Sequence, residues 1–148
     1  MIQRIQTVYL VVAVALLAVA MCLPVAALSP VGDLSKEFVL MNWGCEADGV
    51  CRFIWVLMCL LLLSAVCMMW AIFLYKKRPL QMRISRLGGA ILVVYYILLV
   101  AVIFSDANYS YTLEVGSFLP ALSVALAWMA AHSIKKDEML VRAADRLR

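Results

Sequence analysis

The sequence predicts an all-α membrane protein, a four-transmembrane-helix antiparallel bundle with both termini in the cytoplasm. Three observations support this prediction. Hydrophobic residues make up 67% of the 148-residue chain, whereas a soluble domain has about 45–50% apolar residues. Four long stretches contain no charged residue. The charged residues, 15% of the total, lie in the segments beside and between those stretches.

Each of the four stretches is close to the length that crosses a bilayer, which is about 20 residues at a rise of about 1.5 Å each. A charge at the centre of a span costs about 2.5–3.5 kcal/mol, so its absence from all four favours insertion. The expected spans are residues 8–28, 53–75, 87–104 and 115–134. The whole chain, 1–148, is therefore expected to be a single membrane domain.

The first stretch, 8–28, is interpreted as an uncleaved span. Arg4 would give a signal peptide its positive start, and Val25-Ala26-Ala27 resembles a cleavage site. However, the apolar run is longer than the roughly 7–15 residues of a signal peptide. Pro24 lies late in this span and is expected to bend or end the helix.

The distribution of charge predicts the orientation. All but two of the 13 Lys and Arg residues lie in three segments, which are 1–7, the loop 76–86 and the tail 135–148. Six of the nine acidic residues lie in two outer loops, 29–52 and 105–114. Because Lys and Arg beside spans are retained in the cytoplasm, the three basic segments are expected there.

The net charge of +4 is explained by this topology, and no basic patch interleaved with aromatic residues suggests a nucleic-acid partner. No metal-ligand cluster, P-loop or Gly-x-Ser-x-Gly motif is present, so no cofactor or catalytic residue is expected. The only histidine, His132, lies near the cytoplasmic end of the fourth span and is interpreted as an interfacial group.

Two cysteines lie in the first outer loop. Cys45 and Cys51 flank Asp48-Gly49, a dipeptide typical of turns. Outside the cytoplasm a disulfide between them is favoured, with free thiols as the alternative. Four spans with an outer cysteine pair also resemble the architecture of bacterial quinone-linked disulfide-forming oxidases. Those enzymes use a second pair in a Cys-x-x-Cys motif, which this chain lacks.

Small residues recur at intervals of four in the fourth span, at Ser117, Ala121 and Ala125. Such spacing places small side chains on one helix face and lets another helix approach closely. Packing within the monomer and a homodimer face are both consistent with it.

The two ends of the chain carry a family resemblance. Residues 1–10 read MIQRIQTVYL, and residues 134–148 read IKKDEMLVRAADRLR. Both resemble a domain-of-unknown-function family of small four-span membrane proteins from Bacteroidota. The resemblance implies a multi-pass protein of a Gram-negative inner membrane. It adds no catalytic residue, because the family has no established activity.

The tail 135–148 is expected to form an amphipathic helix at the cytoplasmic membrane surface, with Leu140 and Leu147 facing lipid or protein. The function expected is that of a non-enzymatic accessory, scaffold or assembly factor acting through its cytoplasmic ends on a membrane or cytoplasmic protein. The alternatives are a thiol oxidoreductase using Cys45 and Cys51, and a binder of membrane lipid or a small apolar ligand. The candidate docking residues are Arg4, Lys135, Lys136, Asp137, Glu138, Arg142, Asp145 and Arg146.

Overall fold

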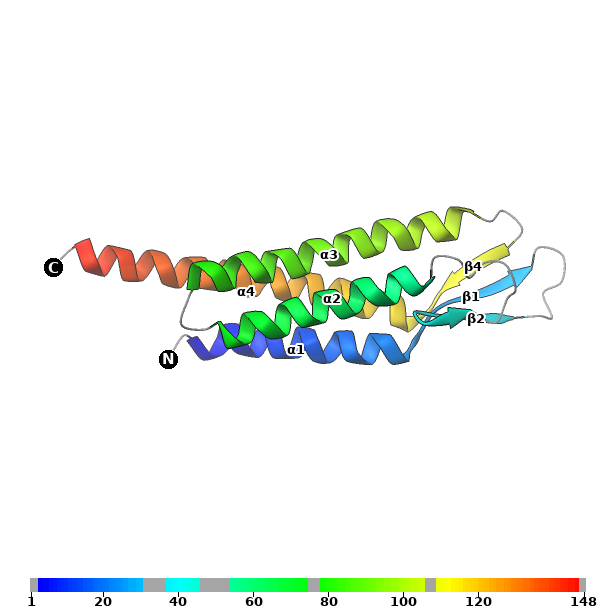
Figure 1. The fold of residues 1–148 in the computed structure, drawn as a ribbon, viewed down its shortest axis with the longest axis horizontal. Coiled ribbons are helices and arrows are strands. Elements are labelled where there is room, and N and C mark those ends of the chain that lie inside the picture. The colour runs from blue at the N-terminus through cyan, green and yellow to red at the C-terminus, as the bar shows by residue number, and fades with distance from the viewer. Residues whose placement is uncertain (1–2, 31–36, 46–53, 75–77, 106–108, 147–148) are drawn as a thin grey trace.

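Four long helices form a bundle, and a small β-sheet lies at one of its ends (Figure 1). A computed structural model describes residues 3–30, 37–45, 54–74, 78–105 and 109–146. The helices are α1 (Gln3–Cys22), α2 (Ile54–Phe73), α3 (Arg78–Ser105) and α4 (Val115–Arg146). The strands are β1 (Pro24–Pro30), β2 (Phe38–Met41), β3 (Gly44–Cys45) and β4 (Tyr109–Leu113).

All four helices are long and apolar enough to cross a membrane, as judged by length and composition. Their mean hydropathy lies between 1.4 and 2.7, yet only 22% to 39% of each apolar segment is buried inside the protein. A helix that is apolar on its outer face as well as its inner face is typical of a membrane span. The prediction of four spans is confirmed at this level. The qualifying segments are Ile5–Cys22, Ile54–Phe73, Pro79–Phe104 and Val115–Asp137.

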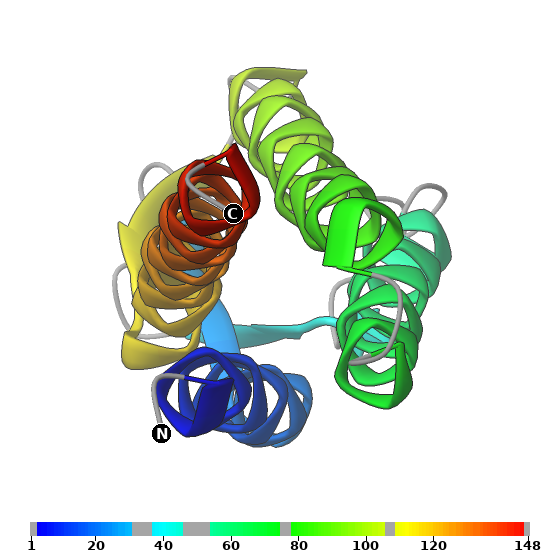
Figure 2. The ribbon, with the colours of Figure 1, turned by 90° about the vertical axis from the view of Figure 1, so that its left-hand side faces the viewer.

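The helices pack around a shared apolar core. Seen from the end of the bundle that carries both chain termini, α1 lies beside α4, α4 beside α3, and α3 beside α2 (Figure 2). Large side chains such as Leu17, Leu61 and Tyr95 fill the centre, while Ala13 and Ala130 are buried where neighbouring helices meet. Small residues at these contacts let helix backbones approach closely, which is how helices associate in lipid.

Buried serines add hydrogen bonds between helices. Three serine hydroxyls each donate a hydrogen bond to a backbone carbonyl of a neighbouring helix. Each of these hydroxyls therefore has a protein partner, which lipid could not supply. The bonds run from Ser64 to Gly88 (3.0 Å), from Ser85 to Ala127 (3.1 Å) and from Ser123 to Ala13 (3.2 Å).

The sheet is a correction to the all-α prediction. Its strand order is β3-β2-β1-β4, and β1 pairs antiparallel with both β2 and β4. The segments expected to be outer loops, 29–52 and 105–114, contribute strands to this sheet. In the sequence, the first segment precedes α2 and the second follows α3. Ala26, Leu28, Leu40 and Ile54 form a second small buried cluster beneath the sheet.

The first helix is shorter than the predicted span 8–28, because α1 ends at Cys22 and β1 begins at Pro24. Proline has no backbone N–H to continue a helix, and it disfavours helical geometry in the residue before it. Pro24 therefore ends the helix, which is one of the two outcomes expected of it. The apolar residues after it continue as a strand.

Two helices are longer than their predicted spans. α3 begins at Arg78, so most of the expected cytoplasmic loop 76–86 is helix. α4 continues without interruption through the tail to Arg146, so the tail is helical as expected but extends the fourth span instead of forming a separate surface helix. Figure 1 shows its last part projecting along the bundle axis, beyond the ends of the other three helices.

Candidate functional site

A buried asparagine links the sheet to the bundle. Asn42 lies in the turn between β2 and β3 and is fully buried. Its Nδ2 donates to the backbone oxygen of Ala20 at 3.0 Å, and its Oδ1 accepts from the Tyr95 hydroxyl at 3.0 Å. Ala20 lies in the last turn of α1, where carbonyls have no partner within the helix. One amide thus connects the sheet with both α1 and α3.

The neighbouring tyrosine connects α3 to the start of α4. The Tyr96 hydroxyl donates to the backbone oxygen of Ser117, and the Ser117 hydroxyl donates to the backbone oxygen of Glu114 at 2.7 Å. The rings of Tyr95 and Tyr96 meet edge to face with centroids 5.3 Å apart. These hydroxyls are engaged in structural hydrogen bonds, so the polar cluster connects the helices near the end of the bundle that carries the sheet.

At the opposite end of the bundle, α1 and α4 meet through a polar pair. The Gln6 side-chain amide donates to the Asp137 carboxylate. This contact brings the two predicted docking segments, the start of α1 and the tail, to the same end of the molecule. Lys135 and Lys136 are exposed, whereas Asp137 is half-buried.

The remaining docking candidates have helical backbones: Arg4 belongs to α1, and the others belong to α4. Their side chains lie outside the described part of the structure. These residues are Arg4, Glu138, Arg142, Asp145 and Arg146.

The strip of small residues on α4 faces in two directions. Ser117 is buried, whereas Ala121 and Ala125 are exposed on the outside of the bundle. The interhelical contact is made instead by Ser123, Ala127 and Ala131, which are all buried. Packing within the monomer therefore does not explain Ala121 and Ala125.

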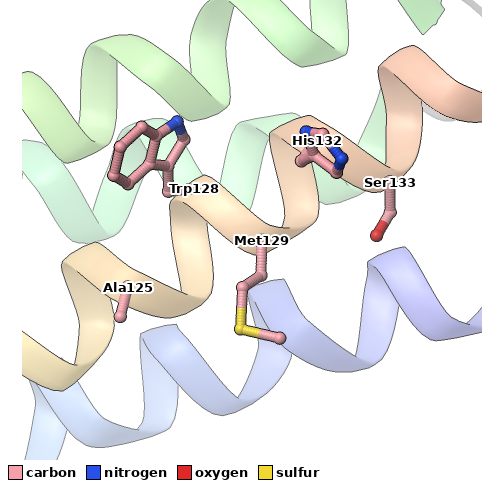
Figure 3. A pocket seen from close by; sticks show the side chains of 5 residues that line it. All are labelled: Ala125, Trp128, Met129, His132 and Ser133. Atoms are coloured by element: carbon pink, nitrogen blue, oxygen red, sulfur yellow. The ribbon is translucent and has the colours of Figure 1, made fainter.

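A groove of about 420 Å³ lies on this exposed face of α4. Figure 3 shows Trp128 and His132 on one side of the α4 ribbon and Met129 and Ser133 on the other, with Ala125 toward the start of α4. The groove is thus apolar along most of its length and polar at the end nearer the tail.

The predicted disulfide lies outside the described residues. Cys45 is the last residue of β3, but its side chain and all of Cys51 are not described, so the pairing stays a prediction. Cys22, Cys59 and Cys67 are free thiols on α1 and α2. Within the described part of the chain, no group of three His, Cys, Asp or Glu side chains is placed to hold a metal ion.

Sequence reasoning missed both Asn42 and the groove. Asn42 is one polar residue in a segment expected to be a loop, and nothing near it in the sequence indicates burial. For the groove, the spacing of Ala121 and Ala125 with His132 was a usable signal, since all three fall on one helical face.

The comparisons with known proteins identify a family without assigning an activity. A search of curated proteins finds no match. A family model described as a domain of unknown function (DUF4293) matches residues 2–147, which is nearly the entire chain. This confirms the expected domain-of-unknown-function family, and the chain belongs to the DUF4293 family.

Proposed function

We propose that the protein is a non-enzymatic accessory or scaffold protein of the inner membrane, an antiparallel four-span bundle that binds a partner protein through the projecting part of α4. The basic end, which carries both termini, would lie in the cytoplasm. The charge distribution supports this orientation, because most Lys and Arg residues lie at that end.

The observation that carries the proposal is the exposed apolar surface beyond the span. The apolar segment of α4 ends at Asp137, and the helix continues for nine residues to Arg146, a length of about 14 Å. Met139 is 56% exposed and Leu140 is 55% exposed on this extension. The helix continues along the bundle axis and does not turn back over the bundle (Figure 1), so these side chains are available to another protein.

The rest of the described molecule favours a structural role. The buried serines, both central tyrosines and Asn42 donate or accept hydrogen bonds within the bundle. The resulting body is well connected internally, and the α4 extension continues from it as one uninterrupted helix. Such a body suits a scaffold, which must present a docking helix in a defined geometry.

The test is loss of a partner when the extension is changed. We expect the double variant Met139→Ser/Leu140→Ser to remain in the membrane at the wild-type level but to lose its crosslinked partner, as identified by mass spectrometry of crosslinked native membranes. Deletion of 138–148 should have the same effect. Truncating a residue at the centre of an interface typically weakens binding by about 1 kcal/mol or more. We therefore expect the double variant to capture the partner about tenfold more weakly than the wild type.

Leu80→Ser is the matched control. Leu80 is an exposed apolar residue of α3 near the same end of the bundle, but it does not lie on the extension. This control should capture the partner as the wild type does. If the chain shortened by residues 138–148 keeps every partner of the full-length protein, the docking proposal is wrong and the extension is a solvated helix.

A further inference from the structure

The lining of the α4 groove changes from apolar to polar along its length. Ala125, Trp128 and Met129 line its apolar part, which lies within the candidate span, and Trp128 is 76% exposed. His132 and Ser133 line the other end, one turn before the span ends at Asp137. The groove therefore runs from the hydrocarbon region to the headgroup level.

Two lysines lie on the same helix face as the polar end of the groove. Helical spacing of about 100° per residue places Lys136 about 40° and Lys135 about 60° from His132. Both lysines are exposed. Their ammonium groups can therefore reach a ligand whose polar part lies beside His132 and Ser133.

The two acidic residues of this turn lie to either side of the groove. Position 137 is about 140° from His132 and about 40° from Ser133, and position 138 is about 120° from His132 in the other sense. The Asp137 carboxylate accepts a hydrogen bond from Gln6 in the contact between α4 and α1. This contact holds the Asp137 carboxylate on the α1 side of α4, and two lysines against one carboxylate leave the polar end of the groove net positive.

We propose that this groove binds one anionic phospholipid from the leaflet on the basic side of the bundle. An acyl chain would lie along Ala125 and the exposed Ala121, and the phosphate would lie beside His132 and Ser133, within reach of both lysines. An apolar track that ends in a basic cluster matches a single amphiphile with a negative headgroup.

A second copy of the chain fits this surface less well. Two copies in one membrane that met through this face would do so about a two-fold axis, which brings the same patch of each copy together. Lys135 and Lys136 of each copy would then face their own equivalents, and like charges repel. An anionic lipid instead supplies the opposite charge.

This inference goes beyond the scaffold role and requires only that α4 spans the membrane. Its test uses the full-length chain in detergent micelles without any partner protein. Native mass spectrometry measures the binding of phosphatidylglycerol and of phosphatidylcholine with identical acyl chains. The wild type should bind phosphatidylglycerol up to about 25-fold more tightly, because each of the two lysines near an anionic headgroup contributes about a fivefold gain.

Three variants locate the site. Lys135→Gln/Lys136→Gln should lose most of the preference for phosphatidylglycerol, and Ala125→Phe should weaken binding of both lipids by filling the apolar track. Arg83→Gln/Arg86→Gln is the matched control, since it removes two exposed cationic groups from α3. That control should keep the wild-type preference within about twofold, because its charges lie outside the groove.

Several results would overturn the proposal. Equal binding of the two lipids by the wild type would show that the groove does not select an anionic headgroup. An equal loss in the Arg83→Gln/Arg86→Gln control would show only diffuse attraction to the basic end. Wild-type binding by Ala125→Phe would place the lipid elsewhere, and a protein dimer that Ala125→Phe dissociates would identify a second copy as the occupant.

Discussion

Gly116→Ala is expected to reduce the stability of the bundle by about 3 kcal/mol, the upper end of the usual range for overpacking. A Cβ atom at Gly116 would lie 2.2 Å from the backbone oxygen of Pro24, 2.9 Å from its carbonyl carbon and 3.0 Å from the backbone oxygen of Leu23. All three atoms are backbone atoms at the junction of α1 and β1, so no side chain can rotate away. The start of α4 would have to move off that junction.

The measurement is the midpoint of thermal unfolding of the purified protein in detergent, followed by circular dichroism. Gly116→Ala should lower it by about 10 °C. Gly89→Ala is the matched control, because its Cβ would meet only Ala127 Cβ at 3.9 Å, an ordinary contact. Alanine also favours helix over glycine by up to about 1 kcal/mol, so the control should be neutral or stabilising. Equal midpoints for the wild type and Gly116→Ala would show that the α1–β1 junction does not pack against α4 this closely.

Asn42→Ala is expected to cost about 3 kcal/mol, because it leaves two buried groups without their partner. The Tyr95 hydroxyl would lose its acceptor, and the Ala20 carbonyl would lose its donor. Tyr95→Phe removes only one of these bonds and should cost about 1 kcal/mol. The double variant should be less destabilised than the sum of the two single variants, by about 1 kcal/mol of coupling.

Thr112→Val is the control for Asn42→Ala. It tests whether the loss of any hydrogen bond in the sheet destabilises the protein as much as the loss of the buried Asn42 bonds. The Thr112 hydroxyl donates to the backbone oxygen of Ala27 at 3.4 Å in an exposed position, where water can replace it. Its loss should change the free energy of unfolding by less than about 0.5 kcal/mol. Additive costs for Asn42→Ala and Tyr95→Phe in the same unfolding assay would mean that the two side chains do not interact.

The four helices could be predicted from the sequence because membrane insertion depends on a local property. A run of apolar residues without charge is sufficient, whichever face later meets protein or lipid. The end of α1 near Pro24 could also be predicted, since a proline at this position must bend or end a helix. The expectation that apolar residues up to Leu28 stay in the span was wrong, because hydropathy alone does not distinguish a buried strand from the continuation of a helix.

The sheet could not be predicted because its pairings join distant segments. Ala27 of β1 pairs with Thr112 of β4 on one side and with Val39 of β2 on the other, and only the pairing of β2 with the two-residue strand β3 is local. Strands this short show no alternation that exceeds chance, and β1 reads as an apolar run. The central strand β1 is stabilised by β4 and by the end of the bundle, and β4 is distant from it in the sequence.

The candidate site was predictable only in part, for a similar reason. Periodicity showed that Ala121 and Ala125 share a face of α4, but it did not show that this face is turned outward while Ala127 and Ala131 pack inward. The candidate docking residues of the tail lie on a helix, as expected, because helical spacing is local. The inward position of Asp137 depends on Gln6 of a different helix, which no local pattern indicates.

The central claim is that the bundle spans the membrane with its basic end, both termini included, in the cytoplasm and its sheet outside. The most direct measurement is a set of reporter fusions at positions 35, 80, 108 and 148, using green fluorescent protein for the cytoplasm and alkaline phosphatase for the outside. Fusions at 80 and 148 should fluoresce without phosphatase activity, and fusions at 35 and 108 should show the reverse, as retention of Lys and Arg on the cytoplasmic side requires. Phosphatase activity at 148, or fluorescence at 108, would contradict the proposed orientation and the assignment of the α4 extension to a cytoplasmic partner.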